Sequence, residues 1–445
     1  MKAVIQAGGK GTRISEITGD VIPKPMLEIS GYPILYHQMM NLKENGITDI
    51  MVIIGHLGNV IKDYFGDGEN LGLNISYVEE DPRKPLGTAG SLYFLKDKIK
   101  ENFVFLLADV FIDIDFEKMV QYHVTNNADV TLLTHPNAHP YDSDLVVEDG
   151  GIVKSFDYKS NDRITYDYSN LVNAGVMIFS PSIFKYLPEL KKCNYEKDII
   201  VPLISEGKVV SYKSSEYAKD MGTPERYRRV QEDYTSGICD AKNLTNKQKA
   251  VFLDRDGTIN EYVGFLRKKE DFKLLPGVTE AIKKINNSGY LAIVVTNQPV
   301  IARGEVTKEG LKGIHKKMET LLGLDGAYID DIYYCPHHPD KGFEGEIPEL
   351  KIECDCRKPK TGMIERAVRE HNIDISSSIM IGDSTLDIKM AENAGMQSIL
   401  LKTGQKGEDG KYQVSPTMVA DDLNDAVDHF LELNVTKKLV KERRN

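Results

Sequence analysis

The sequence predicts an α/β protein with two doubly wound, three-layer α/β/α domains. Short β-rich runs alternate with helical patterns in both halves of the chain, an order typical of mostly parallel sheets covered by helices on both faces. The alternation stops in the polar stretch of residues 231–249 and begins again after it. A chain of 445 residues is also too long for one ordinary core, so two to three domains are expected.

In the first half, the expected strands are short apolar runs. A helix is predicted over residues 34–45, because Leu35, Met39 and Leu42 recur at helical spacing and Gly46 follows as a stop signal. The predicted strands are residues 3–6, 50–54, 75–78 and 103–107.

The second half repeats this alternation beyond a linker predicted at residues 236–248. Helices are predicted over residues 307–322 and 362–371, each with a one-sided apolar stripe. The predicted strands are residues 251–253, 291–295, 332–334, 378–381 and 398–401. The domains are accordingly expected at residues 1–235 and 249–435, followed by a basic tail at residues 436–445.

The bulk composition narrows the function classes. A net charge of −11 leaves no global basic field, so we expect neither nucleic-acid binding nor attachment to an anionic membrane. The first residues reach glycine too soon for a signal peptide, and no apolar run is long enough to cross a bilayer. The cytoplasm is therefore the expected compartment. The sequence leaves the oligomeric state open, and a homo-oligomer is compatible with it.

A glycine-rich loop, Gly8-Gly-Lys-Gly11, follows the first predicted strand. Glycines at such a position let backbone N–H groups approach a phosphate closely. The loop is neither a dinucleotide-binding fingerprint nor a P-loop, because it lacks the remaining elements of both. Arg13 adds a planar fork of donors that suits phosphate oxygens, and two prolines fix the backbone around Lys24. A tight turn and a solvated lysine are the structural alternatives.

These segments resemble the signature of the sugar-1-phosphate nucleotidylyltransferases, which have a Rossmann-like sheet. That family joins a nucleoside triphosphate to a sugar 1-phosphate and releases pyrophosphate. The resemblance covers about residues 1–235 and is nearest to the heptose and mannose guanylyltransferases, which makes GTP the expected nucleotide. The further motifs are Leu86-Gly-Thr-Ala-Gly90, Leu107-Ala-Asp109, Asn173-Ala-Gly-Val-Met-Ile-Phe179, Glu196-Lys-Asp198 and Asp220-Met-Gly-Thr-Pro224.

The resemblance implies roles for individual residues of this half. Arg13 and Lys24 would hold the triphosphate and stabilise the charge that develops at its α-phosphate. Asp109 and Asp220 would share one Mg²⁺. Lys159 would grip the sugar phosphate, although Tyr-Lys-Ser stands here where the family has Glu-Lys-Pro. The nucleotide-binding residues would be Gly8, Gly9, Gly11, Thr12, Gly87 and Thr88.

Two carboxylates, Asp254 and Asp256, close an apolar run at the start of the second half. Residues two apart on an extended segment point to the same side. The segment Asp254-Arg-Asp-Gly-Thr258 resembles the first motif of the haloacid dehalogenase-type phosphatases. The resemblance implies that Asp254 attacks phosphorus to form an aspartyl phosphate. Asp256 would protonate the leaving alkoxide and then deprotonate the attacking water.

The other motifs of that family also stand at the ends of predicted strands. Asp383 would complete a Mg²⁺ site with the two carboxylates of the first motif, and Asp387 would hold the same loop or an outer water. Lys358 would neutralise charge on the phosphate and the nucleophile. The transferred phosphoryl group would be held by Thr296 and by the backbone of Asn297.

A cysteine cluster accompanies these motifs. Cys335-Pro-His337 and Cys354-Asp-Cys356 are two short pairs of nitrogen and sulfur ligands, a set typical of a closed structural Zn²⁺ site in a cytosolic protein. The segment between the pairs has few apolar residues with which to fold on its own, so a metal clip suits it. His338 could replace His337 as a ligand, and free thiols are the alternative.

This combination resembles the D-glycero-D-manno-heptose-1,7-bisphosphate 7-phosphatases and the related histidinol-phosphate phosphatases, over about residues 249–405. It implies that Arg303 and Arg357 contact the second phosphate of the substrate. Ser384 stands where the heptose enzymes often have a lysine, a departure that bears on the substrate rather than on the reaction.

The two resemblances describe consecutive reactions. Removal of the 7-phosphate from a heptose 1,7-bisphosphate gives a heptose 1-phosphate, which is the kind of substrate that a nucleotidylyltransferase consumes. We therefore expect a bifunctional enzyme that makes a nucleotide-activated heptose. One alternative keeps both reactions on other substrates, such as mannose 1-phosphate beside histidinol phosphate. The others are a regulatory nucleotide-sugar binder and a nucleic-acid end-processing phosphatase.

Overall fold

The computed structural model describes residues 1–9, 11–19 and 21–442, without the side chains of Thr12 and of residues 434–442. The chain divides into two compact units. The first comprises Met1–His135, Val146–Asp157 and Val172–Thr245, and the second comprises Pro136–Leu145, Tyr158–Leu171 and Asn246–Asn445. Two segments from the first half of the sequence therefore pack with the second unit, so the units are not the two contiguous stretches that the sequence suggests.

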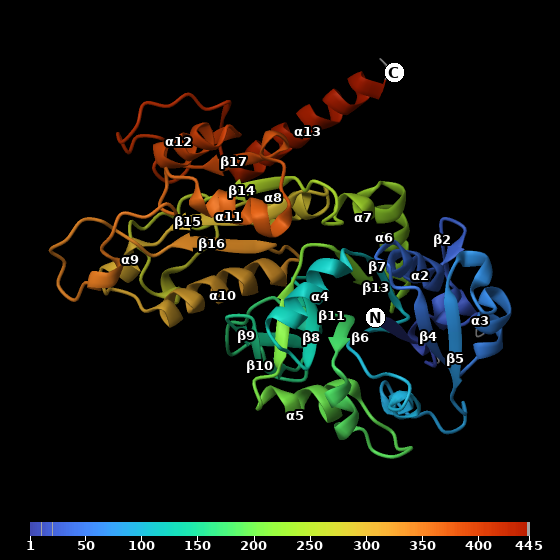
Figure 1. Ribbon diagram of the computed structural model, residues 1–445. Helices are drawn as coiled ribbons and strands as arrows, with labels where there is room; N and C mark the ends of the chain where they lie inside the picture. Colours follow the sequence, from blue (N-terminus) through green and yellow to red (C-terminus); the bar gives the residue numbers. More distant parts are fainter. Residues whose placement is uncertain (10, 20, 443–445) are drawn as a thin grey trace. The chain divides into compact units, whose positions relative to one another are not determined.

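The second unit is built on a six-stranded sheet in which all neighbouring strands are parallel. The order is β16-β15-β14-β17-β18-β19, so the direction of winding reverses between β14 and β17 (Figure 1). The strands are β14 (Ala250–Leu253), β15 (Leu291–Asn297), β16 (Asp331–Cys335), β17 (Ile379–Gly382), β18 (Gln397–Leu401) and β19 (Met418–Ala420).

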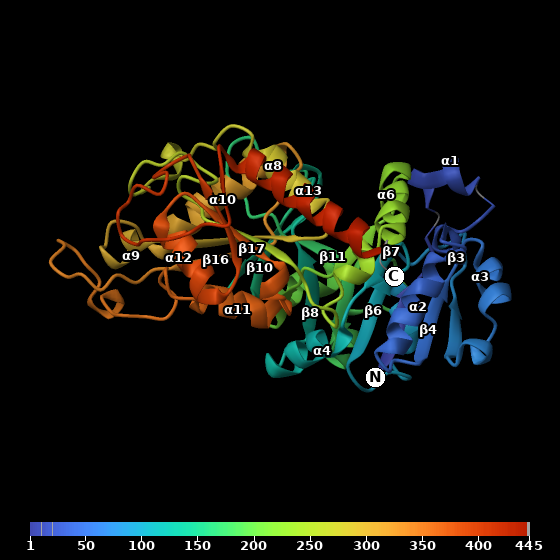
Figure 2. The same ribbon diagram turned by 90° about the horizontal axis from the view of Figure 1, so that it is seen from above.

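Helices cover both faces of this sheet. Along β14, Val251 and Leu253 join one apolar core, whereas Ala250 and Phe252 join another. The first core includes residues of α8 (Val278–Asn286), α10 (Lys308–Leu324) and α13 (Leu423–Glu442), and the second includes residues of α11 (Gly362–His371) and α12 (Thr385–Ala394). Figure 2 shows α8 and α11 on opposite sides of the sheet. The predicted three-layer α/β/α arrangement is confirmed for this unit.

The first unit contains a nine-stranded sheet of order β5-β4-β1-β6-β11-β8-β12-β10-β9. Its first four strands are parallel, but β11 runs antiparallel to both of its neighbours, so the sheet is mixed beyond β6. α2 (Ile34–Glu44), α3 (Gly58–Phe65) and α4 (Phe116–Thr125) contribute to its core. The strands are β1 (Lys2–Gln6), β4 (Asp49–Ile54), β5 (Asn74–Glu79), β6 (Phe103–Leu107), β8 (Val130–His135), β9 (Leu145–Asp149), β10 (Ile152–Asp157), β11 (Val172–Phe179) and β12 (Val209–Lys213).

Each predicted strand and helix is present, with ends that shift by one or two residues. The predicted linker is partly helical, since α7 (Ile238–Ala241) lies within it and Cys239 is buried. The predicted tail belongs to α13 as far as Glu442, and residues 443–445 lie outside the described part of the chain. Among the described helices, none combines the length and the apolar character that a membrane crossing requires.

Candidate active sites

The first candidate site lies where the second sheet reverses its strand order. Asp254 directly follows β14 and Asp383 directly follows β17, and these strands are parallel neighbours with Leu253 opposite Ile381. Open α/β sheets bind their ligands at the carboxyl ends of the strands beside such a reversal. The backbone N–H of Asp254 donates to the carbonyl of Ile381 at 3.0 Å. The fold thus brings together two carboxylates that are far apart in the sequence.

A buried lysine connects these carboxylates. Lys358 Nζ lies 2.7 Å from Asp254 Oδ1 and 2.6 Å from Asp387 Oδ1, and it donates to the carbonyl of Val295 at 3.1 Å. The Lys358 side chain is only 3% exposed, so three acceptors fix its ammonium. Asn297 holds the backbone of Lys358 from both sides, because its Oδ1 accepts from the Lys358 N–H and its Nδ2 donates to the Lys358 carbonyl.

The second carboxylate of the motif, Asp256, has partners of its own. Arg255 Nη2 lies 3.0 and 2.8 Å from its two oxygens, Asn260 donates to Oδ1, and Gln298 donates to Oδ2. Arg255 is fully buried, and its Nη1 lies 3.3 Å from His315 Nε2. Burial alone would raise the pKa of Asp256, but the charge of Arg255 and these hydrogen bonds outweigh it and lower the pKa. Asp256 is therefore ionised at neutral pH and able to accept a proton.

Three carboxylates surround the single positive charge of Lys358. Oxygens of Asp254, Asp383 and Asp387 all lie within 4.8 Å of one another, and Asp256 is outside this group. Burial, against the opposing charge of Lys358, raises the pKa of Asp254 to about 7. Burial, together with Asp254 and Asp387, raises the pKa of Asp383 to about 8. Both oxygens of Asp387 are already engaged, by Lys358 and by the Ser384 loop. The excess charge on Asp254 and Asp383 fits an oxygen-binding divalent cation such as Mg²⁺.

A cavity of about 140 Å³ adjoins this group. Its lining includes Asp254 and Asp256 together with the predicted phosphoryl-binding residue Thr296 and the basic residues Arg357 and Lys358. A small anionic group in the cavity would meet fixed positive charge on one side and the Asp254 carboxylate on the other. This arrangement suits transfer of a phosphoryl group to Asp254.

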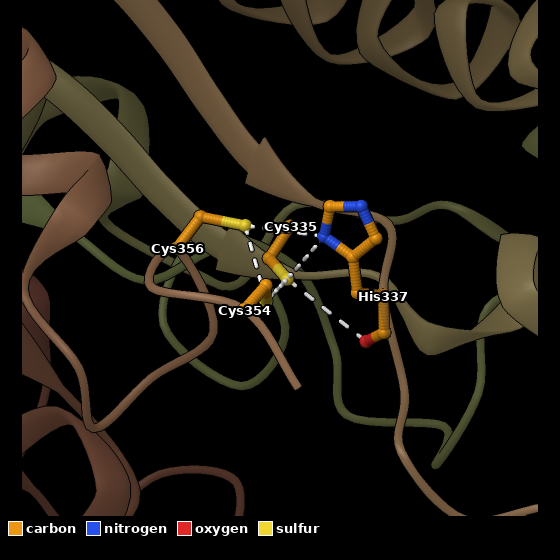
Figure 3. A group of neighbouring side chains, drawn as sticks. All are labelled: Cys335, His337, Cys354 and Cys356. Carbon is orange, nitrogen blue, oxygen red and sulfur yellow. Dashed lines mark hydrogen bonds between the residues drawn. The ribbon is translucent and has the colours of Figure 1, made fainter. Parts of the chain in front are cut away.

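The four predicted zinc ligands form one cluster (Figure 3). Sγ of Cys354 lies 3.6 Å from that of Cys335 and 3.4 Å from that of Cys356, and His337 Nδ1 lies 3.3 Å from Cys356 Sγ. Zn²⁺ with Zn–S bonds of about 2.3 Å has S···S edges of roughly 3.8 Å in a tetrahedron, so the set fits zinc. Hydrogen bonds from Cys335 and His337 outweigh burial and lower the pKa of Cys356 to about 5, which favours the thiolate ligand. His338 is not in the group and lies near Asp340 instead.

The second candidate site lies at the corresponding place in the first sheet, where the strand order reverses between β1 and β6. The Gly8–Arg13 loop follows β1, and Asp109 comes two residues after β6. Asp220 ends β13 (Tyr217–Asp220), which is antiparallel to β7 (Val110–Asp113) with Asp220 opposite Val110. The N–H of Met221 donates to the Asp109 carbonyl at 3.0 Å. The carboxylates of Asp109 and Asp220 therefore lie on neighbouring strand ends.

Two basic residues reach the same place. Lys24 Nζ forms an ion pair with Asp109 Oδ2 at 2.7 Å, and the Lys24 side chain is 6% exposed. Arg13 lies against Gly222, since a Cβ added there would be 3.1 Å from Arg13 Nη2 and 2.7 Å from Asp220 Oδ1. Asp109 and Asp220 remain 34% and 38% exposed. Two cations and two accessible carboxylates thus converge, an arrangement that suits a polyphosphate with a divalent cation.

Glycines shape the loops around this second site. Gly11 has a φ of +65°, in the left-handed region that favours glycine. Gly87, with a φ of +80°, passes so close to the chain that a Cβ would lie 2.5 Å from the Cys193 carbonyl. Gly9 faces open space, and Thr88 Oγ1 accepts from the N–H of Tyr195 at 3.1 Å. The predicted nucleotide-binding loops therefore depend on glycine, while the Thr12 side chain lies outside the described residues.

Comparison with known proteins gives a family for each part of the chain. The Nucleotidyl transferase family matches residues 2–237, more than half of the chain, and a HAD-hydrolase-like family matches residues 355–426. The D-glycero-beta-D-manno-heptose-1,7-bisphosphate 7-phosphatase of Haemophilus ducreyi is 43% identical over 160 residues, which is 36% of this chain and 85% of that protein. The chain belongs to the nucleotidyl transferase family and, through its second part, to the heptose-bisphosphate phosphatase family.

A second phosphatase and one solved structure are also similar to parts of this chain. The D-glycero-alpha-D-manno-heptose-1,7-bisphosphate 7-phosphatase of Photorhabdus laumondii is 44% identical over 160 residues, again 36% of this chain and 85% of that protein. The crystal structure of HddC from Yersinia pseudotuberculosis is 25% identical, covers 52% of this chain and 99% of its own, and has a TM-score of 0.45. The family matches and the phosphatase relatives show that the chain combines a nucleotidyl transferase with a HAD-type phosphatase.

Two residues predicted to contact substrate, Lys159 and Arg303, lie in surroundings that the sequence did not predict. Lys159 belongs to the phosphatase unit, where its 54% exposed side chain lies 3.3 Å from Asp142, so the structure does not group it with the nucleotidyl transferase residues. The Arg303 guanidinium lies 4.2 and 4.3 Å from the ring centres of Phe265 and Phe343. Phe265 and Arg357 line the phosphatase cavity, and Arg303 does not.

Four polar residues hold the sites without having been assigned a role from sequence. They are Arg255, Asn260 and Gln298, which contact Asp256, and Arg226, which forms an ion pair with Asp220. Arg255 could have been noticed, because a charged residue between two aspartates after an apolar run needs partners when it is buried. Arg226 gives no such signal, since it lies in the polar helix α6 (Pro224–Thr235).

Proposed function

We propose that this enzyme removes the 7-phosphate of D-glycero-D-manno-heptose 1,7-bisphosphate and then transfers GMP from GTP to the resulting heptose 1-phosphate. The observation that carries the proposal is the presence, on one chain, of a phosphatase whose relatives are named for heptose 1,7-bisphosphate and of a nucleotidyl transferase site. The product of the first reaction is the class of acceptor that the second requires. GTP is chosen because the first-half motifs resemble the heptose and mannose guanylyltransferases. Both reactions would take place in the cytoplasm.

In the phosphatase reaction, a carboxylate oxygen of Asp254 attacks the phosphorus of the 7-phosphate, and the bond to the sugar oxygen breaks. Lys358 neutralises charge on the phosphoryl oxygens, and Thr296 with Asn297 holds them. Asp256, ionised in the free site, would take up the proton that a phosphate monoanion brings and pass it to the leaving alkoxide. Asp256 then takes a proton from the water that hydrolyses the aspartyl phosphate. Its fixed partners, Arg255 and Gln298, support this role by keeping the carboxylate oriented.

In the nucleotidyl transfer, the phosphate oxygen of heptose 1-phosphate displaces pyrophosphate from the α-phosphorus of the triphosphate. Arg13 and Lys24 would bind the phosphates and stabilise the charge of the crowded transition state. Gly8, Gly9, Gly11 and the Gly87–Thr88 turn would receive the nucleotide. The role of Lys159 in binding the sugar phosphate remains a proposal from the motif alone.

Metal ions have separate places in this proposal. Asp254 and Asp383 would hold Mg²⁺ in the phosphatase unit, and Asp109 and Asp220 would hold it in the transferase unit. Bound Mg²⁺ would neutralise phosphate charge in both reactions. Cys335, His337, Cys354 and Cys356 would hold a structural Zn²⁺ that fixes the loop leading to Arg357 and Lys358.

The test is to incubate the full chain with Mg²⁺, each of the four nucleoside triphosphates, and either anomer of heptose 1,7-bisphosphate. Both anomers are needed, because relatives of nearly equal identity are named for the alpha and the beta form. Phosphate, pyrophosphate and nucleotide sugar are followed separately. We expect phosphate release without nucleotide, and pyrophosphate release only when both GTP and dephosphorylated heptose 1-phosphate are present. Turnover only with another triphosphate would refute the choice of GTP, and phosphate release from neither anomer would refute the heptose assignment.

A further inference from the structure

One basic residue of the phosphatase cavity has no task in the reaction described so far. The basic residues in the cavity lining are Arg357, Lys358 and Lys411. Lys358 is committed to Asp254, Asp387 and the Val295 carbonyl, and one guanidinium nitrogen of Arg357 donates to the His337 carbonyl. The Lys411 side chain is exposed, and its ammonium pairs with no other residue in the described part of the chain.

The segment that carries Lys411 is fixed to the catalytic strand ends. Asp409 accepts from the backbone N–H and the hydroxyl of Thr385 at 2.8 and 2.7 Å, and the N–H of Tyr412 donates back to Thr385 Oγ1 at 3.3 Å. Thr385 begins α12, two residues after Asp383. Lys411 is therefore held between two attachment points on the helix that follows Asp383, unlike a lysine on a free loop.

The preceding part of the same loop is attached even more closely. The N–H of Gln405 donates to Asp383 Oδ2 at 2.6 Å, and the N–H of Gly407 donates to the Asp383 carbonyl at 2.8 Å. Thr403 Oγ1 donates to the carbonyl of Gly257 at 2.6 Å. The loop of residues 403–412 thus rests on both aspartate motifs, and its Lys411 lines the same cavity as the neutral Ser384.

The positive charge of Lys411 suits one class of substrate, the sugar bisphosphates. A bisphosphate brings a second phosphate that is not transferred, and Lys358, which is committed to Asp254 and Asp387, does not balance the charge of this group. We propose that Lys411 binds that second phosphate and so favours sugar bisphosphates over monophosphates. The inference rests on the proposed phosphatase function. It assigns Lys411 to substrate selection and not to the chemical step.

The test compares Lys411→Met with Lys406→Met, a matched control on the same loop whose exposed side chain does not line the cavity. For heptose 1,7-bisphosphate, Lys411→Met should raise KM roughly 5- to 20-fold with little change in kcat, as expected for a partly solvated charge contact. For p-nitrophenyl phosphate, which has a single phosphate, kcat/KM should change less than about 2-fold. Lys411→Arg should restore the bisphosphate preference. Unchanged activity on p-nitrophenyl phosphate reports that the phosphatase unit of each variant is folded.

The inference is overturned if Lys411→Met leaves KM for the bisphosphate unchanged, or if both substrates lose activity equally. It is also overturned if Lys406→Met has the same effect, because the loop would then act only through its general charge. A wild-type enzyme that prefers p-nitrophenyl phosphate to both bisphosphate anomers would instead refute the proposed function, and this inference with it. The wild-type measurement therefore distinguishes the two failures.

Discussion

The two candidate sites occupy the same place in their sheets but differ in how their charges are buried. Both lie where the strand order reverses, between β14 and β17 in one unit and between β1 and β6 in the other. In the phosphatase unit, Asp254 and Lys358 are 12% and 3% exposed and are joined directly. In the transferase unit, Asp109 and Asp220 are 34% and 38% exposed, and each is neutralised by its own basic residue.

This difference indicates how much each site must rearrange when substrate arrives. The phosphatase carboxylates already surround a cavity, and their buried partners leave few alternatives, so little reorganisation is required. In the transferase unit, the ion pairs Lys24–Asp109 and Arg226–Asp220 each occupy one carboxylate oxygen that a cation could otherwise bind. We therefore expect those pairs to exchange partners when the nucleotide and Mg²⁺ bind.

The largest effect should follow from replacing the buried nucleophile. Asp254→Asn should lower phosphate release by roughly 10⁴-fold or more, because asparagine lacks the carboxylate oxygen that attacks phosphorus. Nucleotidyl transfer from supplied heptose 1-phosphate should be unchanged, because Asp254 belongs to the other unit. Retention of phosphate release would show that the carboxylate cluster is not the reaction centre.

A smaller effect is expected in the transferase site, which we call the open site because its carboxylates are partly exposed. Arg13→Ala should lower kcat of nucleotidyl transfer by about 10²- to 10³-fold, the usual cost of removing one donor to a developing charge. Arg228→Ala is the matched control, because Arg228 is exposed on α6. Phosphate release should stay at the wild-type rate in both variants. Equal losses in Arg13→Ala and Arg228→Ala would mean that Arg13 acts only through general positive charge.

The zinc cluster belongs to the phosphatase unit, whose catalytic charges are buried. Cys356→Ser should abolish zinc binding, measured by elemental analysis, and should lower phosphate release by about 10- to 100-fold because the loop before Lys358 loses its anchor. Cys193→Ser is the control, since Cys193 lies outside the cluster. Full zinc occupancy in the Cys356→Ser enzyme would contradict the assigned ligand set.

The sequence predicts the parts of the molecule in which one strong pattern decides the outcome. Buried parallel strands such as Ala250–Leu253 are continuous apolar runs, and each such predicted strand is found. Strands such as β10 (Ile152–Asp157) do not meet this criterion, because only Val153 and Phe156 are buried and Lys154 interrupts the apolar run. The mixed part of the first sheet was therefore not foreseen.

The sites follow the same rule. The sequence identified Asp254, Lys358 and the zinc ligands, because each stands in a short motif of definite spacing. The partners that orient these groups, such as Arg255 for Asp256, depend on contacts across the fold. The packing of residues 158–171 with the second unit likewise depends on tertiary contacts, such as the 2.7 Å ion pair between Asp167 and Lys269.

A buried carboxyl outside both sites extends the comparison to stability. Glu216 accepts from the N–H groups of Asp115 and Leu244 and from the Ser214 hydroxyl. Unlike Asp256, which pairs with Arg255, it forms no ion pair with a lysine or arginine in the described part of the chain. Burial, partly opposed by these hydrogen bonds, raises its pKa from 4.5 to about 7. The folded state thus binds the proton more tightly than the unfolded state, so this contribution is complete below about pH 4.5 and is lost as the pH rises towards 7.

Glu216→Gln should remove the loss of stability that wild type suffers as the pH rises towards 7. The glutamine oxygen can accept from both N–H groups, and its amide can donate to Ser214. Between about pH 5 and pH 8, the stability of the variant relative to wild type should rise by roughly 3 kcal/mol at most. Scanning calorimetry of the full chain measures this change, with the exposed Glu117→Gln as control. A parallel pH dependence in all three proteins would show that Glu216 is not a titrating group in this range.

The smallest effect concerns the ion pairs of the open site. If Arg226 competes with Mg²⁺ for Asp220, Arg226→Ala should lower the Mg²⁺ concentration needed for half-maximal nucleotidyl transfer by about 5-fold, the value of a partly exposed ion pair. Arg228 lies two residues after Arg226 on α6, and Arg228→Ala should leave the Mg²⁺ requirement unchanged. The Mg²⁺ requirement of phosphate release should be the same in all variants, because the buried carboxylates of that unit do not pair with Arg226. A higher Mg²⁺ requirement in Arg226→Ala would mean that the pair positions Asp220 for the cation, and the open site would then be as preformed as the buried one.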